Sequence, residues 1–221
     1  VRTFLLHGRG LRCRDQSFPL PLKFVHRERL LQLLTAHHPI DAEEERSRGR
    51  LLDFVGAHAD CFERTLAVGH VTGSAWLLDR RGSRTLLTFH RKLGRWLQLG
   101  GHADGDPDVL AVALREAGEE SGIDGIEPES CDIFDVDVHR IPARANEPEH
   151  DHYDVRFLLR VTGDDAFRLS EESVSLRWFS IEELAEIETD DSVRRMARKW
   201  QASMGATGGL PTSGFRLRGS T

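Results

Sequence analysis

Cysteine, tyrosine and methionine are scarce in this chain, which contains three cysteines, one tyrosine and two methionines. Cys13, Cys61 and Cys131 are odd in number, lie far apart and include no Cys-x-x-Cys pair. A disulfide framework or a zinc knuckle usually needs an even or closely spaced set. We therefore expect incidental or buried thiols in a reducing compartment, and a cytoplasmic location.

Long apolar runs are also missing from the sequence. None approaches the roughly 20 residues that a helix needs to cross a bilayer, so we expect no membrane partner. Basic residues are not in excess, because 36 acidic side chains outnumber 30 basic ones and give a net charge of −6. This balance argues against a nucleic-acid partner but permits a small phosphate ligand held through a metal. The 39% hydrophobic and 30% charged residues that are present are typical of a globular protein with a sizeable core.

Two amphipathic patterns begin the chain, over residues 23–37 and 41–62, and predict helices. We expect residues 1–65 to form an N-terminal helical extension that packs as a cap on the main domain, with a dimer interface or a lid as the alternatives. The main domain is expected over residues 66–204. A tail rich in glycine, serine and threonine follows from 205 to 221 and is expected to be flexible.

From Gly69 the apolar residues alternate with a period of two, which is typical of strands. Strands are predicted over residues 70–79, 85–90, 96–99, 131–141, 153–161 and 175–179, and a last helix over 190–204. Strands on both sides of one central helix, with another helix at the end, predict an α+β fold with a mixed sheet.

The central helix, over residues 111–121, carries the clearest chemical signal. Glu116, Glu119 and Glu120 are three and four positions apart and therefore share one helix face. Three carboxylates this close repel one another unless a cation lies among them. Oxygen ligands favour a hard divalent ion, so we expect Mg²⁺ or Mn²⁺.

The ends of this helix are also marked. Asp106 is suited to the N-cap, Pro107 to the first helical position and Gly122 to a left-handed stop. Gly100 and Gly101 precede the helix and allow close approach of a ligand to the backbone, and the carbonyl oxygen of Gly100 is a candidate metal ligand.

Residues 115–123, REAGEESGI, resemble the core of the Nudix box of the MutT-like hydrolases, G-x5-E-x7-R-E-U-x-E-E-x-G-U, in which U is a bulky apolar residue. Gly101 stands at the spacing of the opening glycine. Two positions depart from the pattern, because the first glutamate falls on Pro107, with Asp106 as its stand-in, and the first U is Ala117. A looser resemblance extends over residues 69–187.

The resemblance implies an α/β/α sandwich and the metal-dependent hydrolysis of a nucleoside diphosphate linked to another group. It implies that Glu119 and Glu120 are the firmest metal ligands and take part in catalysis, that Glu116 is a further ligand, and that Arg115 orients a glutamate through a salt bridge. Family members often recruit one more carboxylate from a loop, and Glu147 and Glu149 are the candidates for a base or ligand here.

Histidines form a second signal. One is His102, which directly follows Gly100 and Gly101 in the segment that we call the glycine loop. The others are His139 at the end of one strand, and His150 and His152 near the start of the next. Imidazoles in this arrangement predict either a second site for a softer metal such as Zn²⁺ or Mn²⁺, or contacts to phosphate.

Arg91, Lys92 and Arg95 precede the glycine loop and are candidate phosphate contacts, with a solvated turn as the alternative. Two other functions stay open, a nucleotide-binding regulatory module and an enzyme similar to isopentenyl-diphosphate isomerase. The isomerase carries Cys-Gly-His where this chain has Gly100-Gly101-His102, so the position of its catalytic cysteine is empty here. Regulatory modules commonly lose carboxylates of the box, whereas this chain keeps all three glutamates, so hydrolysis is favoured. The sequence does not identify the substrate within the nucleotide derivatives, and it leaves open whether the chain forms a homodimer.

Overall fold

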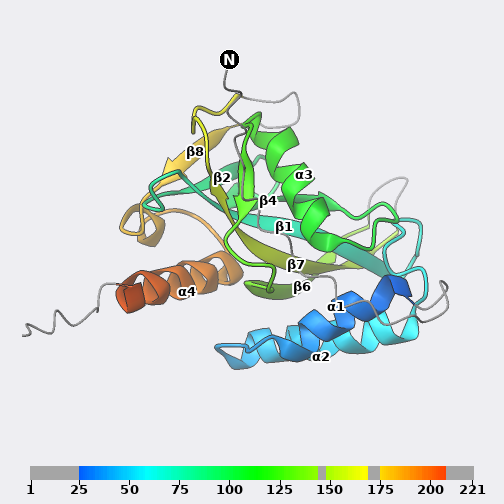
Figure 1. The fold of residues 1–221 in the computed structure, drawn as a ribbon. Coiled ribbons are helices and arrows are strands. Elements are labelled where there is room, and N and C mark those ends of the chain that lie inside the picture. The colour runs from blue at the N-terminus through cyan, green and yellow to red at the C-terminus, as the bar shows by residue number, and fades with distance from the viewer. Residues whose placement is uncertain (1–24, 144–147, 169–174, 208–221) are drawn as a thin grey trace, which may run out of the picture.

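The computed structural model describes residues 25–143, 148–168 and 175–207, which form one eight-stranded sheet covered by helices (Figure 1). In chain order the elements are α1 (Val25–Ala36), α2 (Ala42–Ala57), β1 (Gly69–Leu78), β2 (Thr85–His90), β3 (Arg95–Leu97), β4 (Leu99–His102), α3 (Val109–Ser121), β5 (Ile126–Pro128), β6 (Asp135–Ile141), β7 (His150–Val161), β8 (Leu176–Phe179), the 3₁₀ turn η1 (Glu183–Ala185) and α4 (Asp191–Thr207).

The sheet is mixed and centred on β1 and β7, which run parallel along the whole length of β1. β7 pairs antiparallel with β5 and β6 on its other edge, and β1 pairs antiparallel with β2 and β4. β2 in turn pairs with β3 and β8. Every residue of β1 is buried, as a parallel strand covered on both faces should be. The predicted α+β class with a mixed sheet is confirmed.

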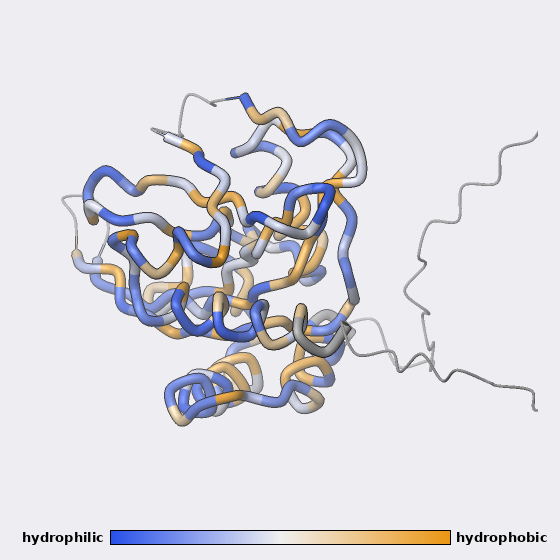
Figure 2. The backbone as a smooth tube through the Cα atoms, turned by 90° about the vertical axis from the view of Figure 1, so that its left-hand side faces the viewer, coloured by the Kyte–Doolittle hydropathy of each residue, from blue (hydrophilic) through white to orange (hydrophobic). Residues whose placement is uncertain are grey.

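The two faces of the sheet carry separate hydrophobic clusters, so the molecule is an α/β/α sandwich. Val71 and Phe157 belong to the cluster that also contains apolar residues of α1, α2 and α3. Trp76 and Leu78 point to the other face, where residues of α4 cover them. In Figure 1, α3 and α4 lie across the sheet from each other, and in Figure 2 the hydrophobic stretches gather toward the middle of the molecule.

The two N-terminal helices add apolar side chains to the core of the sheet. Phe54 of α2 stacks on Tyr153 of β7, with ring centroids 3.8 Å apart and planes within 4°. Asp41 caps α2 by accepting a hydrogen bond from the Glu44 N–H at 2.9 Å. The boundary at residue 65 stays a prediction. The core residues from these helices are Leu30, Leu34, Leu51, Phe54 and Val55.

Several predicted bounds are wrong. The second helix ends at Ala57 rather than 62, and its last N–H group, that of His58, bonds back to the Phe54 carbonyl. The predicted strand over 96–99 is two strands, because the chain leaves β2 at Leu97 and joins β1 at Leu99. The strand predicted from 131 begins at Asp135, β7 begins at His150, and β5 was not predicted.

The predictions for the two ends of the chain can be compared with the structure only over the described residues. α1 begins at Val25, and the part of the chain before it lies outside the described residues. α4 continues to Thr207, so the expected tail does not begin at Gly205, and residues 208–221 lie outside the description.

The two cysteines in the described residues differ in state. Cys61 is a buried free thiol, as expected, whereas Cys131 is disulfide-bonded, so the expectation of incidental thiols is wrong for that residue.

Among the helices of the described residues, none combines the length and the apolar character needed to cross a membrane.

Candidate active site

Helix α3 lies unusually close to strand β1 because of small residues. A Cβ on Gly73 would lie 2.8 Å from the Val109 carbonyl oxygen and 2.9 Å from Val112 Cγ1, so only glycine permits this approach. Ala113 and Ala117 are fully buried on the inner side of the helix. The face that carries the three glutamates is thereby held near the glycine loop.

The ends of α3 correct one prediction and confirm another. The N-cap is Asp108, whose side chain accepts a hydrogen bond from the Ala111 N–H at 3.3 Å, and not Asp106. Asp106 instead accepts a hydrogen bond from the Asp108 N–H at 2.9 Å, so the N-cap lies two residues later than predicted. Gly122 ends the helix with φ of 62°, the left-handed stop that was predicted.

Glu116 lies against Gly101, which stands opposite Gly73 in the pairing of β1 with β4. A Cβ on Gly101 would overlap the Glu116 carboxylate, so the missing side chain leaves the space that this carboxylate occupies. Arg115 Nη2 donates to Glu116 Oε1 and to the His102 carbonyl oxygen, each at 2.9 Å. The hydrogen bond with Glu116 raises the pKa of Arg115, which therefore stays a fixed positive charge between the helix and the loop.

The three glutamates of α3 suit a hard divalent cation. Glu116 and Glu120 are half-buried, Glu119 is exposed, and Glu120 Oε2 is shielded from solvent. Carboxylate oxygens beside a close-packed glycine loop form the all-oxygen donor set that Mg²⁺ and Mn²⁺ prefer. The residues present therefore fit such an ion.

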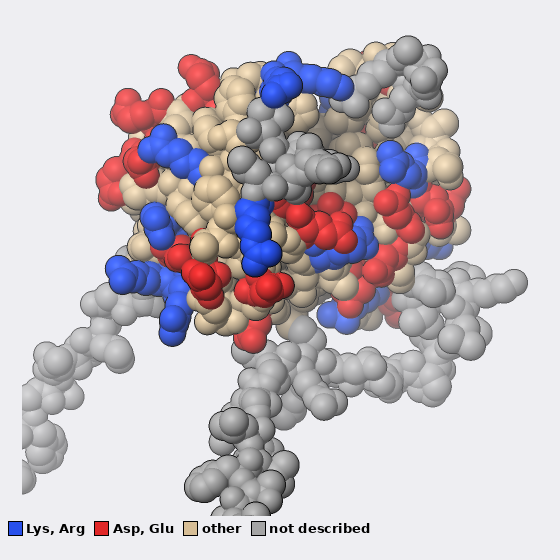
Figure 3. Space-filling model, turned by 90° about the horizontal axis from the view of Figure 1, so that it is seen from above, with Lys and Arg blue, Asp and Glu red and all other residues tan. Residues whose placement is uncertain are grey.

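Other candidate residues lie away from this helix face. Glu149 is exposed, and its Oε1 lies 3.1 Å from Arg140 Nη1, next to the ion pair between Arg140 and Asp151. Glu147 lies outside the described residues. The basic candidates, which are Arg91, Lys92 and Arg95, are exposed around the turn between β2 and β3. Figure 3 shows acidic and basic side chains interspersed over the face seen from above.

The histidines converge on the opposite face of the sheet from Gly101. His152 stands opposite His70 on β1 and opposite His139 on β6, so these three side chains point the same way. His102 stands opposite Thr72, two residues along from His70, and His150 precedes His152 by two. The ring of His70 lies 4.9 Å from that of His102, 5.0 Å from that of His150 and 4.8 Å from that of His152.

His70 was not identified as a candidate from the sequence, because it is a single histidine at the start of a strand whose other residues are typical of a buried strand. The signal that could have revealed it is the alternation of His70, Thr72 and Ser74, which are polar residues on one face of a buried strand. His152 is half-buried, and burial together with the neighbouring imidazoles lowers its pKa to about 2. Its ring is therefore neutral at physiological pH.

Asp154 continues this polar face beyond the histidines. Its carboxylate accepts hydrogen bonds from Thr72 Oγ1 at 2.9 Å, Ser74 Oγ at 2.7 Å, Gln98 Nε2 at 3.1 Å and Arg156 Nε at 2.7 Å. Asp154 is almost fully buried, and these four donors satisfy a charge that would otherwise be costly to desolvate.

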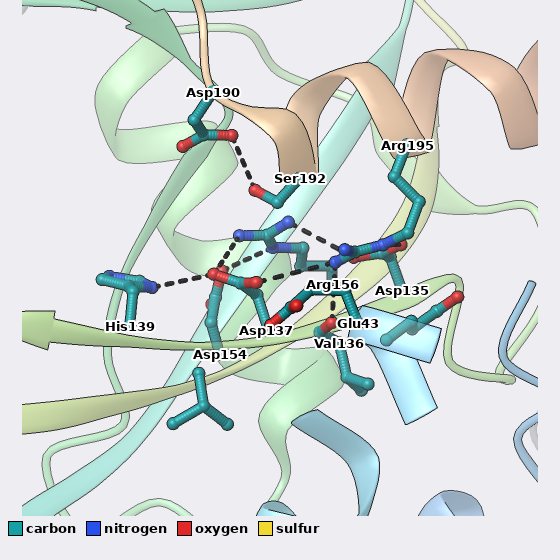
Figure 4. Close-up of polar contacts among 12 residues, drawn as sticks. Glu43, Asp135, Val136, Asp137, His139, Asp154, Arg156, Asp190, Ser192 and Arg195 are labelled. Atoms are coloured by element: carbon teal, nitrogen blue, oxygen red, sulfur yellow. Dashed lines mark hydrogen bonds and ion pairs between the residues drawn. The ribbon is translucent and has the colours of Figure 1, made fainter. Parts of the chain in front are cut away.

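A buried ionic cluster follows beneath α4 (Figure 4). Arg156 contacts Asp135 at 3.3 Å and Asp137 at 3.5 Å, and Arg195 of α4 contacts the Asp135 carboxylate with two nitrogens at 2.8 Å. Burial raises the pKa of Asp137, but the Arg156 charge and the hydrogen bond with His139 outweigh it and lower the pKa to about 2. The polar face of β6 and β7 is thus neutralised internally.

Comparison with known proteins points to one family. The NUDIX domain model matches residues 69–200, which is more than half of the chain. A C. elegans Ap4A hydrolase binary complex is 20% identical, with 62% of this chain and 98% of that chain covered and a TM-score of 0.49. The MutT protein from Methanosarcina mazei Go1 is 21% identical, with 63% and 97% covered and a TM-score of 0.46.

A ligand-bound NUDIX domain is also among the similar structures. The NUDIX domain of Shewanella oneidensis NrtR, complexed with ADP ribose, is 17% identical, with 61% of this chain and 87% of that chain covered and a TM-score of 0.42. No curated protein matches the chain.

Proposed function

The chain belongs to the Nudix family, a family of hydrolases that act on phosphoric anhydrides, and from this premise we propose that it hydrolyses the diphosphate linkage of a nucleoside diphosphate derivative. The observation that carries the proposal is the contact of the Arg115–Glu116 pair with the glycine loop. This contact fixes one glutamate of the box against the backbone, with Glu119 and Glu120 one helical turn further along.

Glu116, Glu119, Glu120 and the carbonyl oxygen of Gly100 are the proposed ligands of Mg²⁺ or Mn²⁺. Such an ion, when bound, neutralises diphosphate charge and lowers the pKa of a water molecule. The protein residues supply the positioning. Arg115 holds one oxygen of Glu116, so the carboxylate does not have to reorganise during the reaction.

The glycine loop and the basic turn would serve the substrate. At Gly101 the missing side chain makes room for the Glu116 carboxylate, and we propose that phosphate oxygens reach this glutamate through the bound metal ion. Arg91, Lys92 and Arg95 are proposed to attract phosphate from the exposed turn between β2 and β3. Glu149 is the proposed general base, and in that role it would have to exchange its ion pair with Arg140 for a water molecule.

The test is turnover of a panel of nucleotide derivatives, with Mg²⁺ and then with Mn²⁺. The panel holds ADP-ribose, dinucleoside polyphosphates, oxidised nucleoside triphosphates and nucleotide coenzymes. Glu119→Gln and Glu120→Gln should each reduce metal-dependent turnover by more than about 100-fold, because even outer-shell partners of a metal ligand cost roughly 10–100-fold. Glu43→Gln, on the exposed side of α2, is the matched control and should leave turnover unchanged.

Three outcomes would contradict the proposal. If no compound turns over but a nucleotide raises the melting temperature of the wild type, the chain is a nucleotide-binding module. If turnover persists in both glutamine variants, the reaction does not depend on this helix face. A product that is an isomer of its substrate would indicate isomerase chemistry, which the glycine at position 100 already disfavours.

A further inference from the structure

The parallel pairing of β1 with β7 assembles a compact group of histidines. Residue-by-residue register places His70 opposite His152, and His150 lies two positions earlier on the same face of β7. One ring nitrogen from each of His70, His150 and His152 can be chosen so that the three atoms lie within 4.8 Å of one another. His70 and His150 are buried and His152 is half-buried, so packing restricts the motion of the three rings.

The donor atoms are of one chemical kind. Imidazole nitrogens suit Zn²⁺ and its neighbours in the first transition row, whereas Mg²⁺ prefers oxygen ligands. Zinc binds imidazole at about 2.0–2.1 Å, so the ligand atoms of a tetrahedral site lie roughly 3.4 Å apart. Small rotations of the three side chains would therefore close the observed spacing around one ion.

We propose that His70, His150 and His152 form a site for one divalent transition-metal ion, with a fourth position left for water or a substrate oxygen. His152 Nε2 is buried and has no hydrogen-bond partner among the described residues, which leaves its lone pair or proton unsatisfied. A buried polar atom of this kind is costly, and coordination of a metal removes the cost. Three imidazoles with one open position form the ligand set of known catalytic zinc sites.

The remaining histidines have separate places around the site. His139 Nδ1 lies 3.1 Å from Asp137 Oδ2, and its ring is 5.5 Å from that of His152, so it is assigned to Asp137 and not to the metal. The ring of His102 lies 5.2 Å from that of His152, beside the proposed site. Because the carbonyl oxygen of His102 accepts from Arg115, the residue joins the histidine group to the Nudix helix.

This inference stands without the proposed hydrolysis, because it concerns a different set of ligands. Its test is metal binding by the chain, carrying no polyhistidine tag and stripped with a chelator. Calorimetric titration with Zn²⁺ near neutral pH, in excess Mg²⁺ that occupies the Nudix carboxylates, should show one Zn²⁺ ion per wild-type chain. Co²⁺ in place of Zn²⁺ should give the intense visible absorption of a four-coordinate site.

The variants separate the site from adventitious binding. His152→Gln and His150→Gln should each weaken Zn²⁺ binding by more than about tenfold and remove the visible Co²⁺ bands. His38→Gln, in the exposed turn after α1, should bind as the wild type does. Glu119→Gln and Glu120→Gln should keep Zn²⁺ binding even though hydrolysis is lost, which distinguishes this site from the Nudix carboxylates.

The proposal is overturned if the wild type binds less than one Zn²⁺ per chain, or if both histidine variants bind Zn²⁺ as tightly as the wild type does. Cooperative thermal unfolding without metal shows whether each variant is folded, and either folded variant suffices. If both variants fail to fold, the intensity of the wild-type Co²⁺ bands decides, because six-coordinate binding gives only weak bands and contradicts the site.

Discussion

Arg156 lies in the middle of β7 with its side chain 1% exposed and three aspartates around it. Asp135, Asp137 and Asp154 raise its pKa, although burial acts in the opposite direction. Removing one partner of a buried ionic group leaves the others desolvated without compensation, which is much more costly than the loss of a surface ion pair. We therefore expect Arg156 to contribute more to stability than a surface arginine does.

We expect Arg156→Met to lower the free energy of unfolding by about 3–5 kcal/mol near neutral pH, as measured by urea denaturation. Arg160→Met, on the same strand, removes a partly exposed partner of Glu129 and should cost at most about 1 kcal/mol. Equal losses in the two variants would show that the buried cluster contributes no more than a surface pair.

The same variant has a predicted pH dependence. The pKa of Asp137 is lowered to about 2 in the folded protein, so its stabilising contribution is present above its unfolded pKa and is lost as the pH falls through 2. Without Arg156 this pKa should rise, and acid unfolding of Arg156→Met should begin at a higher pH than in the wild type. If the variant and the wild type unfold at the same acidic pH, as measured by circular dichroism, Arg156 is not the cause of the lowered pKa of Asp137.

The sequence predicted the alternation along β6 but not where its polar side chains point. Asp135 and Asp137 fit the outward positions of a half-exposed strand, which usually face solvent. Their partner Arg156 lies 21 positions from Asp135, on a neighbouring strand, and Arg195 lies 60 positions away. A period within one strand contains no information about such partners, so the burial of these charges emerged only from the fold.

At the scale of elements, the contact between α3 and β4 decides whether the glutamates of the box are held in place. Gly101→Ala would place a methyl group where the Glu116 carboxylate lies, and the carboxylate would have to move. We expect metal-dependent turnover to fall at least about tenfold while cooperative unfolding is retained. The measurements are turnover with Mn²⁺ and the thermal transition of each protein.

Gly118→Ala is the matched control on the same helix. The nearest atom to a Cβ at this position is the Ile123 carbonyl oxygen at 3.9 Å, so alanine fits. Because glycine costs helix interiors roughly 0.5–1 kcal/mol relative to alanine, this variant should melt at a higher temperature with turnover unchanged. A loss of turnover in both variants would point to helix α3 in general, and not to the space at Gly101.

The elements of the site differed in how far the sequence determined them. Helix α3 was predictable because its apolar period, its glycine stop and the spacing of its glutamates all agree. The strand after Trp96 was not, since the chain changes pairing partner at Gln98 and apolar spacing does not report a change of partner. The histidine group was only partly predictable, because His70 joins it through a parallel pairing that no local pattern specifies.

At the scale of the whole molecule, one buried carboxylate joins the N-terminal helices to the last one. Glu44 of α2 is fully buried and accepts from His37 at 2.7 Å, from the Ile40 N–H at 2.9 Å and from Lys199 of α4. Lys199 also lies 3.0 Å from Asp135 of β6. Burial raises the pKa of Glu44, but the hydrogen bonds from His37 and Lys199 prevail and lower it to about 2.

Glu44→Gln should therefore lower the free energy of unfolding by about 3 kcal/mol near neutral pH, because it leaves Lys199 short of one buried partner. In the wild type this contribution is present above the unfolded pKa of the glutamate and is lost as the pH falls through about 2. Glu43→Gln, the exposed neighbour, should change stability by less than about 0.5 kcal/mol. Urea denaturation measures both.

Hydrogen exchange of the same variants tests whether the chain unfolds as one unit. We expect amides in α1, α2 and the central strands to lose protection together in Glu44→Gln, since the helices and the sheet share one hydrophobic cluster. If α1 and α2 open while β1 and β7 stay protected, the boundary predicted at residue 65 separates two independently stable units.

The pairing of β1 with β7 also sets an order of events during synthesis. Thr72 and Asp154, which meet across this pair, are 82 positions apart in the chain. Closing so long a loop is entropically costly, and contacts of this range slow folding. The nascent chain can form α1, α2 and the β1–β2 hairpin early, but the centre of the sheet must wait until β7 has left the ribosome. Until then β1 exposes an unpaired strand edge. A chaperone that shields such edges would therefore bind the nascent chain mainly between the synthesis of β1 and that of β7.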